Sequence, residues 1–253
     1  MKLDLNPSWI RMSYVNEIVN DLIDTAVAET RNAEPNRDYL GASAIGEECE
    51  RKIQYQQRHG STFPGRVYRI FERGHWVEDA CVEWMRQAGF VLKTKKKDGK
   101  QFGFEIGSPS GKKYKGHSDG VIVEVPKILR GVIKTPAGWE CKGVNDDGYE
   151  KFMEHGLKSA YPAYYDQVSQ YATYLDLTNQ YVVFVINMND MRIGVELIEF
   201  DAGRAQYVSD KAVRIIEAET HGELLPRAFP NPDFYKCRAG WCEFREKCWE
   251  GQI

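Results

Sequence analysis

The run from Gln180 to Met188 constrains the fold of this chain more than any other stretch. It is almost continuously apolar and rich in β-branched and aromatic residues, which is typical of a strand that is buried on both faces. Residues 194–200 have the pattern of a neighbouring strand. We therefore expect a β-sheet with this run as a central strand.

Other periodic segments surround this run. Apolar residues at helical spacing predict helices over residues 9–30, from Ser43 as an N-cap, over 77–88 up to Gly89, and over 149–156, 163–177 and 202–219. Strand-like stretches are residues 90–94, 101–106, 116–125, 131–135 and 139–144. Their order predicts an α/β (α+β) fold with a central mixed β-sheet flanked by helices.

The chain has 253 residues, which allows one large domain with appendages. No apolar stretch reaches the length of a membrane span, and the N-terminus lacks the apolar core of a signal peptide. We therefore expect a cytoplasmic protein without a membrane partner. The net charge of −3 gives no overall attraction to nucleic acid, so such binding would need a local basic surface.

Lysines are concentrated between Lys93 and Lys115. A segment of this kind either holds phosphates or forms a hairpin whose lysines point into water. The candidates for DNA contact are Lys95, Lys96, Lys97, Lys112, Lys113 and Lys115.

A candidate catalytic centre follows this basic segment. Glu140 and Lys142 are two residues apart on a predicted strand, so their side chains share one face while Cys141 points to the other. Asp119 precedes the apolar run 121–125, and the turn residues between these segments allow the two strands to pair. Carboxylate oxygens suit Mg²⁺ or Mn²⁺, and a lysine adds charge beside an attacking water. A half-solvated strand shows the same charge alternation.

Two predicted helices carry polar side chains that can reach the same centre. Glu78 lies one turn from His75, and either is a candidate ligand or an ordinary surface residue. Gln167 and Tyr171 are also one turn apart and can present an amide and a phenol to one place. Aromatic residues at this spacing are typical of core packing too, but a glutamine on that face needs a polar partner.

Three cysteines lie within twelve residues near the C-terminus: Cys237, Cys242 and Cys248. In a reducing compartment such a group indicates a metal site rather than disulfides. Zinc and a cubane cluster both usually take four ligands. Cys49 is the preferred fourth ligand, because Cys81 and Cys141 lie on apolar faces; His221 is the alternative. The spacing alone does not distinguish zinc from iron.

The chain resembles the PD-(D/E)XK nuclease superfamily through four motifs in order: Gly74-x-x-x-Glu78, Gly116-x-x-Asp119-Gly120, Glu140-x-Lys142 and Gln167-x-x-x-Tyr171. It is similar to the RecB-like exonuclease branch, which includes phage recombination exonucleases and CRISPR adaptation nucleases with a C-terminal cysteine cluster. The resemblance implies a restriction-endonuclease-like core over residues 41–225. Residues 1–40 would be an N-terminal helical extension, and residues 226–253 a cysteine segment that packs on the core with Cys49.

The resemblance also implies roles for the metal-binding residues. Asp119, Glu140 and the backbone carbonyl of Cys141 would bind Mg²⁺ or Mn²⁺. Glu78 would complete that site or hold a second ion. The four cysteines would hold a [4Fe-4S] cluster that staples the N- and C-terminal parts together, with Zn²⁺ as the alternative.

The other implied roles concern the reaction itself. Lys142 would orient or deprotonate the attacking water and stabilise negative charge on the phosphate. Gln167 and Tyr171 would steady the site near the scissile phosphate or touch the DNA backbone.

We therefore expect a divalent-metal-dependent deoxyribonuclease, with an exonuclease mode by analogy, acting on DNA with free ends in DNA processing, recombination or repair. A recombination or single-strand-annealing partner would be unspecified, and the location would be the host cytoplasm if a phage encodes the protein. The alternatives are a non-catalytic or zinc-stabilised DNA-end binding module and a structure-specific endonuclease of the same fold.

Overall fold

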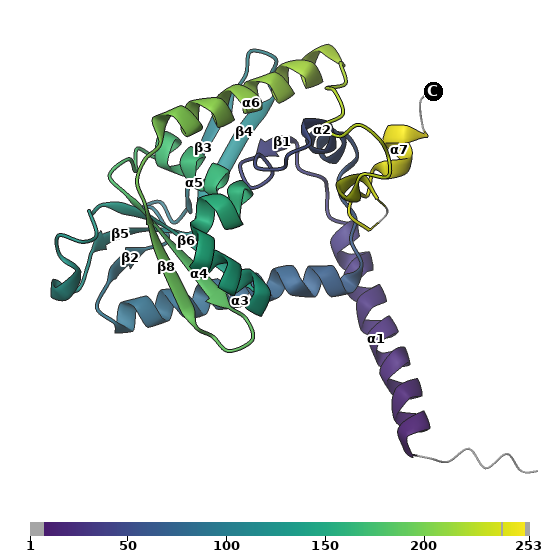
Figure 1. The fold of residues 1–253 in the computed structure, drawn as a ribbon, viewed down its shortest axis with the longest axis horizontal. Coiled ribbons are helices and arrows are strands. Elements are labelled where there is room, and N and C mark those ends of the chain that lie inside the picture. Colours follow the sequence, from purple (N-terminus) through teal and green to yellow (C-terminus); the bar gives the residue numbers. More distant parts are fainter. Residues whose placement is uncertain (1–7, 239, 251–253) are drawn as a thin grey trace, which may run out of the picture. The chain divides into compact units, whose positions relative to one another are not determined.

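The computed structural model of the protein describes residues 8–238 and 240–250, and Figure 1 shows their helices and strands. The chain divides into two compact units. The first comprises Met1–Asn36 and Ser61–Trp76, and the second comprises Arg37–Gly60 and Val77–Ile253. Across the described residues, no helix has the length and apolar character needed to cross a membrane.

The first unit contains α1 (Ser8–Asn32) and the first half of α3 (Gly65–Gln87). α1 confirms the helix predicted near the N-terminus. Arg69 pairs with Asp24 at 2.6 Å, and Gly65 lies against the backbone of Asp24 so closely that a Cβ would come within 2.1 Å of its carbonyl oxygen. The two helices therefore meet at a position where only glycine fits.

A five-stranded sheet forms the centre of the second unit. It contains, in spatial order, β2 (Val91–Lys93), β5 (Gly120–Glu124), β6 (Ala137–Val144), β7 (Tyr181–Asn187) and β8 (Ile193–Ile198). β6 and β7 are parallel, and the other neighbours are antiparallel. Every residue of β7 is buried. The predicted mixed sheet with a buried central strand is confirmed.

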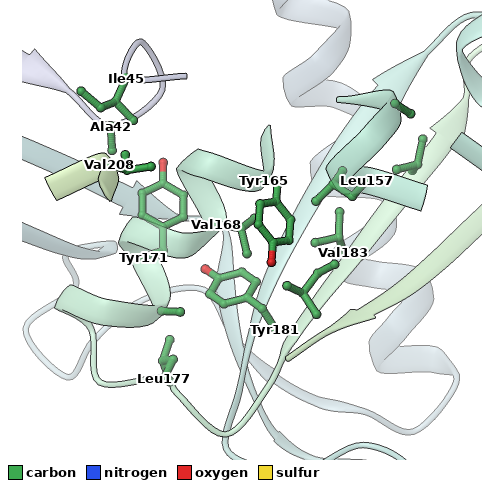
Figure 2. Close-up of a cluster of buried hydrophobic side chains, with 14 of the residues drawn as sticks. Ala42, Ile45, Leu157, Tyr165, Val168, Tyr171, Leu177, Tyr181, Val183 and Val208 are labelled. Carbon is green, nitrogen blue, oxygen red and sulfur yellow. The ribbon is translucent and has the colours of Figure 1, made fainter. Parts of the chain in front are cut away.

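Different helices cover the two faces of this sheet. Val183 packs in one cluster with α4 (Asp146–Ala160) and α5 (Pro162–Tyr174), part of which Figure 2 shows. Its neighbour Val182 packs in another cluster with Cys81 and the second half of α3. Successive side chains of a strand point to opposite faces, so a strand covered on both sides has to be continuously apolar.

A three-stranded sheet adjoins the first one along the chain. Its order is β1 (Tyr39–Gly41), β4 (Lys113–Ser118), β3 (Phe102–Gly107), with β1 parallel and β3 antiparallel to β4. Tyr114 and Phe104 pack edge to face and belong to the cluster that includes α5. Asp119 alone separates β4 from β5, so the chain passes from one sheet to the other at this residue.

The remaining elements are α2 (Glu50–His59), the 3-10 turns η1 (Lys127–Leu129) and η2 (Tyr235–Cys237), α6 (Ala202–His221) and α7 (Arg245–Trp249). α6 contacts both α5 and α2. The Asp201 side chain accepts the backbone N–H of Arg204 at 2.9 Å and caps its start, and Gly222 ends it at a φ of 71°.

The helix expected from Ser43 begins later than predicted. α2 starts at Glu50, and its N-cap is Cys49. Residues 42–46 form turns because Ala42 and Ile45 are buried in the core and hold this segment against it. Ser43 is therefore not a helix cap.

The strand predictions also need correction at three places. The stretch 116–125 is two strands, because the chain changes sheets at Asp119. Residues 131–135 form no strand beyond an isolated bridge between Arg130 and Ile133. β1 was not predicted, since three residues are too few to show a period.

Candidate active site

The junction between the two sheets places Asp119 beside the strand that carries Glu140. β5 pairs with β6 so that Gly120 lies opposite Trp139. The Asp119 carboxylate accepts the backbone N–H of Cys141 through Oδ2 at 2.9 Å. The two predicted strands are therefore neighbours, and Asp119 touches β6 between the predicted catalytic acid and base.

Glu140 and Lys142 meet the polar residues of α5 on one side of β6. Lys142 Nζ donates to Glu140 Oε1 at 2.6 Å, and Gln167 Nε2 donates to the same oxygen at 3.2 Å. Gln167 also donates to the Tyr171 hydroxyl at 2.7 Å. Glu140 is only 1% exposed, whereas the Lys142 side chain is 19% exposed. The carboxylate is thus buried while the lysine reaches the surface.

Crowding of acids changes the proton affinity of the site. Burial and the charge of Asp119 raise the pKa of Glu140 to about 8. Burial, Asp119 and Asp79 raise the pKa of Glu78 to about 7. Burial alone would lower the pKa of Lys142, but Glu140 and Asp119 outweigh it and hold that pKa well above its usual range. The acids together exceed what one lysine neutralises, and this favours an added cation.

One oxygen of Glu140 lacks a hydrogen-bond partner. Oε1 takes two donors, while Oε2 is buried and unpaired. A buried polar atom of this kind is usually completed by an ion or a water. Among the residues that the structure describes, no three Asp, Glu, His or Cys side chains converge closely enough to hold an ion between them. The donor set, carboxylate oxygens of which one is buried and unpaired, fits Mg²⁺ or Mn²⁺, which take one or two protein carboxylates and otherwise water and substrate oxygens.

Two residues that were not candidates from the sequence brace this junction. The Ser118 hydroxyl lies 3.2 Å from the Gly120 carbonyl and 3.3 Å from the Trp139 carbonyl, and it bonds to the Tyr181 hydroxyl. Ser118 and Tyr181 are both buried. The available signal was a tyrosine at the start of an otherwise largely apolar strand, because a buried phenol needs a hydrogen-bond partner.

The predicted DNA-contacting lysines form two groups, one before β3 and one after the turn that follows it. The two ends of β3 are about 17 Å apart, and Lys115 lies midway along the strand, opposite Glu105. Lys95, Lys96 and Lys97 precede β3, whose first residue pairs with Ser118 beside Asp119. Lys112, Lys113 and Lys115 follow the turn at its other end. Glu105 pairs with Lys113 at 2.7 Å and with Lys115 at 2.9 Å. The first group lies at the end of the sheet that carries Asp119, and Lys113 lies at the other end.

Four cysteines line a pocket elsewhere in the second unit: Cys49, Cys237, Cys242 and Cys248. Cys49 comes from the N-cap of α2, and the other three come from the C-terminal segment. His221, the alternative ligand, does not line it. Cys81 and Cys141 are buried in the core behind β6, where their thiols bond to each other.

The C-terminal segment is joined to α2 mainly by side chains. The Gln54 amide donates to the Glu223 carbonyl at 3.0 Å and accepts the Leu225 N–H at 2.8 Å. The Tyr55 and Phe244 rings lie 5.5 Å apart. These contacts keep the three C-terminal cysteines beside the start of α2.

The pocket provides positive charge and hydrogen-bond donors to its sulfurs. The Trp249 indole donates to Cys237, and the Phe244 backbone N–H donates to Cys242. Four basic side chains line it, Arg51, Lys52, Arg227 and Lys236, of which Lys52 pairs with Glu47 and Lys236 with Glu48. A group bound by several thiolates carries net negative charge, so these surroundings suit a thiolate-bound metal group.

Comparisons with protein families and with curated proteins give no match. Among solved structures, an alkaline exonuclease (LHK-Exo) from Laribacter hongkongensis is similar, with a TM-score of 0.50, 14% identity and coverage of 74% of this chain and 92% of that chain. LHK-Exo in complex with dAMP gives a TM-score of 0.50, 14% identity and coverage of 73% and 91%. The structure of SSO0001 covers 89% of this chain and 94% of its own, with 14% identity and a TM-score of 0.49. The likeness to LHK-Exo shows that the two chains share an α/β fold, which is the fold class that the sequence predicted.

Proposed function

We propose that this protein is a divalent-metal-dependent deoxyribonuclease that hydrolyses phosphodiester bonds at the site formed by Asp119, Glu140 and Lys142. The observation that carries the proposal is the state of Glu140. The Glu140 side chain is fully buried, and its Oε2 has no hydrogen-bond partner. Lys142 donates to its other oxygen, and Asp119 accepts the backbone N–H of the next residue, Cys141. Burying a carboxylate in this way is costly, and an active site that binds a cation explains it.

Each residue of the candidate active site would have its own role in hydrolysis. Asp119 and Glu140 would hold Mg²⁺ or Mn²⁺ together with the backbone carbonyl of Cys141, and Glu78 would complete the site or hold a second ion. A bound ion would polarise the phosphate and make water a better nucleophile. Lys142 would orient or deprotonate that water and stabilise negative charge that develops on the phosphate. Gln167 would keep Glu140 in place from α5, with Tyr171 orienting its amide.

We further propose an exonuclease that acts on DNA ends during recombination or repair. The fold likeness to an alkaline exonuclease supports this mode, as does the complex of that protein with dAMP, a single nucleotide. Lys95, Lys96 and Lys97 are the lysines best placed to contact the DNA backbone next to the site, because they lie at the Asp119 end of the sheet.

The four cysteines would hold a [4Fe-4S] cluster. In a zinc site four sulfurs surround one ion at about 2.3 Å, whereas in a cubane each sulfur binds a different iron. The four cysteines share one pocket, and four sulfur ligands suit a cubane cluster as well as a zinc ion. The resemblance to exonucleases with a C-terminal cysteine cluster is the ground for preferring the cluster. The cluster would join α2 to the C-terminal segment.

The proposed reaction is tested by incubating the protein with Mg²⁺ or Mn²⁺ and two DNA substrates of the same sequence. One is linear with each strand labelled separately at its ends, and the other is a closed circle. We expect the linear DNA to be digested from its ends and the circle to remain intact. Digestion of the circle would show an endonuclease, and binding without cutting of either DNA would show a non-catalytic end-binding module.

A further inference from the structure

Lys142 has a second neighbour besides Glu140. Its ammonium lies over the ring of Tyr164, 5.0 Å from the ring centroid. Tyr164 is in the first turn of α5 and is partly exposed. An ammonium group over an aromatic face is attracted by the electrons of the ring, most strongly where water is partly excluded. Tyr164 therefore attracts the Lys142 ammonium through its ring, whereas Glu140 attracts it through a negative charge.

The ring of Tyr164 is itself held in place. It stacks on the Tyr161 ring with centroids 5.3 Å apart and an interplanar angle of 27°. Tyr161 in turn carries the Lys151 ammonium 5.8 Å from its centroid, and Lys151 donates to the Ala160 carbonyl at 3.1 Å. Two stacked rings at the start of a helix lose little freedom when they bind a cation, because each has few rotatable bonds.

The contact between Lys142 and Glu140 conflicts with the proposed role of Glu140. The oxygen that accepts from Lys142 already accepts from Gln167 as well. When Glu140 binds a divalent ion through its unpaired Oε2, the ion repels the ammonium at Oε1 and neutralises part of the carboxylate charge. The attraction between Glu140 and Lys142 then weakens at the moment when the lysine has to point at the substrate.

We propose that Tyr164 is the positioning residue that keeps the Lys142 ammonium at the active site once Glu140 has bound the metal ion. A ring attracts the ammonium but does not bind the metal ion, since it offers no charged ligand. This inference rests on the proposed nuclease function. It goes beyond that function by assigning a role to a residue outside the four motifs.

The kinetic test compares Tyr164→Leu with Tyr164→Phe. We expect Tyr164→Leu to lower kcat by roughly 5- to 30-fold, the range of a partly desolvated cation–ring contact, with KM and the Mg²⁺ requirement changed less than about twofold. Tyr164→Phe keeps the ring and retains at least about half of the wild-type kcat. Tyr207→Leu is the matched control: its ring faces the Arg204 guanidinium at 4.9 Å on α6, and it is 53% exposed.

A second measurement follows the ammonium directly and does not depend on activity. Lysines are methylated with a ¹³C reagent, and the Lys142 signal is assigned with Lys142→Arg. A methyl group over a ring gives an upfield-shifted signal in NMR, which we expect in wild type, Tyr164→Phe and Tyr207→Leu, before and after Mg²⁺ is added. The shift is lost in Tyr164→Leu.

The outcomes separate this inference from the proposed function. A normal kcat for Tyr164→Leu, an equal loss in Tyr164→Phe, or an upfield shift that disappears in wild type when Mg²⁺ is added would overturn the role of Tyr164. If wild type cuts no DNA while the shift persists with Mg²⁺, the contact is real and the nuclease function is wrong.

Discussion

The two candidate metal sites of this protein are built in different ways. The carboxylate site comes from regular elements: Glu140 and Lys142 lie on a central strand, and Gln167 lies on a helix packed against it. The cysteine pocket combines Cys49 at a helix cap with a C-terminal segment that contains only a 3-10 turn and a five-residue helix. A strand ladder holds its side chains before any ion binds, whereas an irregular segment depends more on its bound group.

This difference predicts that the carboxylate site controls activity with little effect on folding, and that the cysteine pocket controls stability. Lys142→Ala should lower the rate of DNA hydrolysis by about 10³-fold or more, because it removes both the acid–base group and a charge at the phosphate. Initial rates of nucleotide release from end-labelled linear DNA measure this. Lys134→Ala is the control, since Lys134 pairs with Glu199 on the surface at 2.9 Å. Equal cutting by wild type and Lys142→Ala would contradict the assignment.

Loss of Cys49 should show the effect of the cysteine pocket separately from that of the carboxylate site. If the pocket holds a [4Fe-4S] cluster, protein purified without oxygen is brown with broad absorption near about 400 nm. Cys49→Ser should lose most of its iron and colour and melt at lower temperature, since the cluster would join α2 to the C-terminal segment. Cys81→Ser, in the core behind β6, should keep both iron and colour. Colourless wild-type protein that carries zinc would replace the cluster with a zinc site.

When no divalent ion is present, the buried Glu140 carboxylate should lower the stability of the folded protein as the pH rises. The pKa of Glu140 is raised to about 8 in the folded protein from about 4.5 when unfolded. The folded state therefore binds more protons between these values, and stability falls as pH rises through this window. Gln cannot ionise, so the melting temperature of Glu140→Gln should fall less between pH 5 and pH 8.

At pH 8 and without added metal, Glu140→Gln should thus melt a few degrees above wild type. Each kcal/mol of unfolding free energy that the variant recovers raises the melting temperature by roughly 2–4 °C. The same variant should be inactive in DNA hydrolysis. Thermal unfolding of both proteins across this pH range measures the difference. Parallel curves for the two proteins would show that Glu140 is not protonated in the folded state.

The smallest effect is expected where α5 supports the site. Gln167→Leu removes one hydrogen bond to Glu140 and one to Tyr171, and it should lower kcat by about 5- to 10-fold. Gln206→Leu on the surface of α6, whose amide bonds to Asp210 at 2.7 Å, should leave the rate within about twofold. A loss for Gln167→Leu as large as that for Lys142→Ala would mean that the amide acts in the reaction itself.

Much of the candidate active site could be predicted from local patterns. The period of two along β6 put Glu140 and Lys142 on one face, and the period of a helix put Gln167 beside Tyr171. The pattern failed at Asp119, where residues 116–125 looked like one strand. Its side chain acts at a break between two sheets, and no local period marks such a break.

Local residue patterns were enough to identify the central strand and the side chains that share a face, because these follow from the backbone geometry of a few neighbouring residues. What each face meets was set by the folded chain as a whole. It paired Asp119 with the backbone of β6, joined Ser118 to Tyr181, brought Cys49 to the C-terminal cysteines, and laid Tyr164 under Lys142. These contacts join residues far apart in the chain, and they are selected by the packing of the whole core rather than by any local preference.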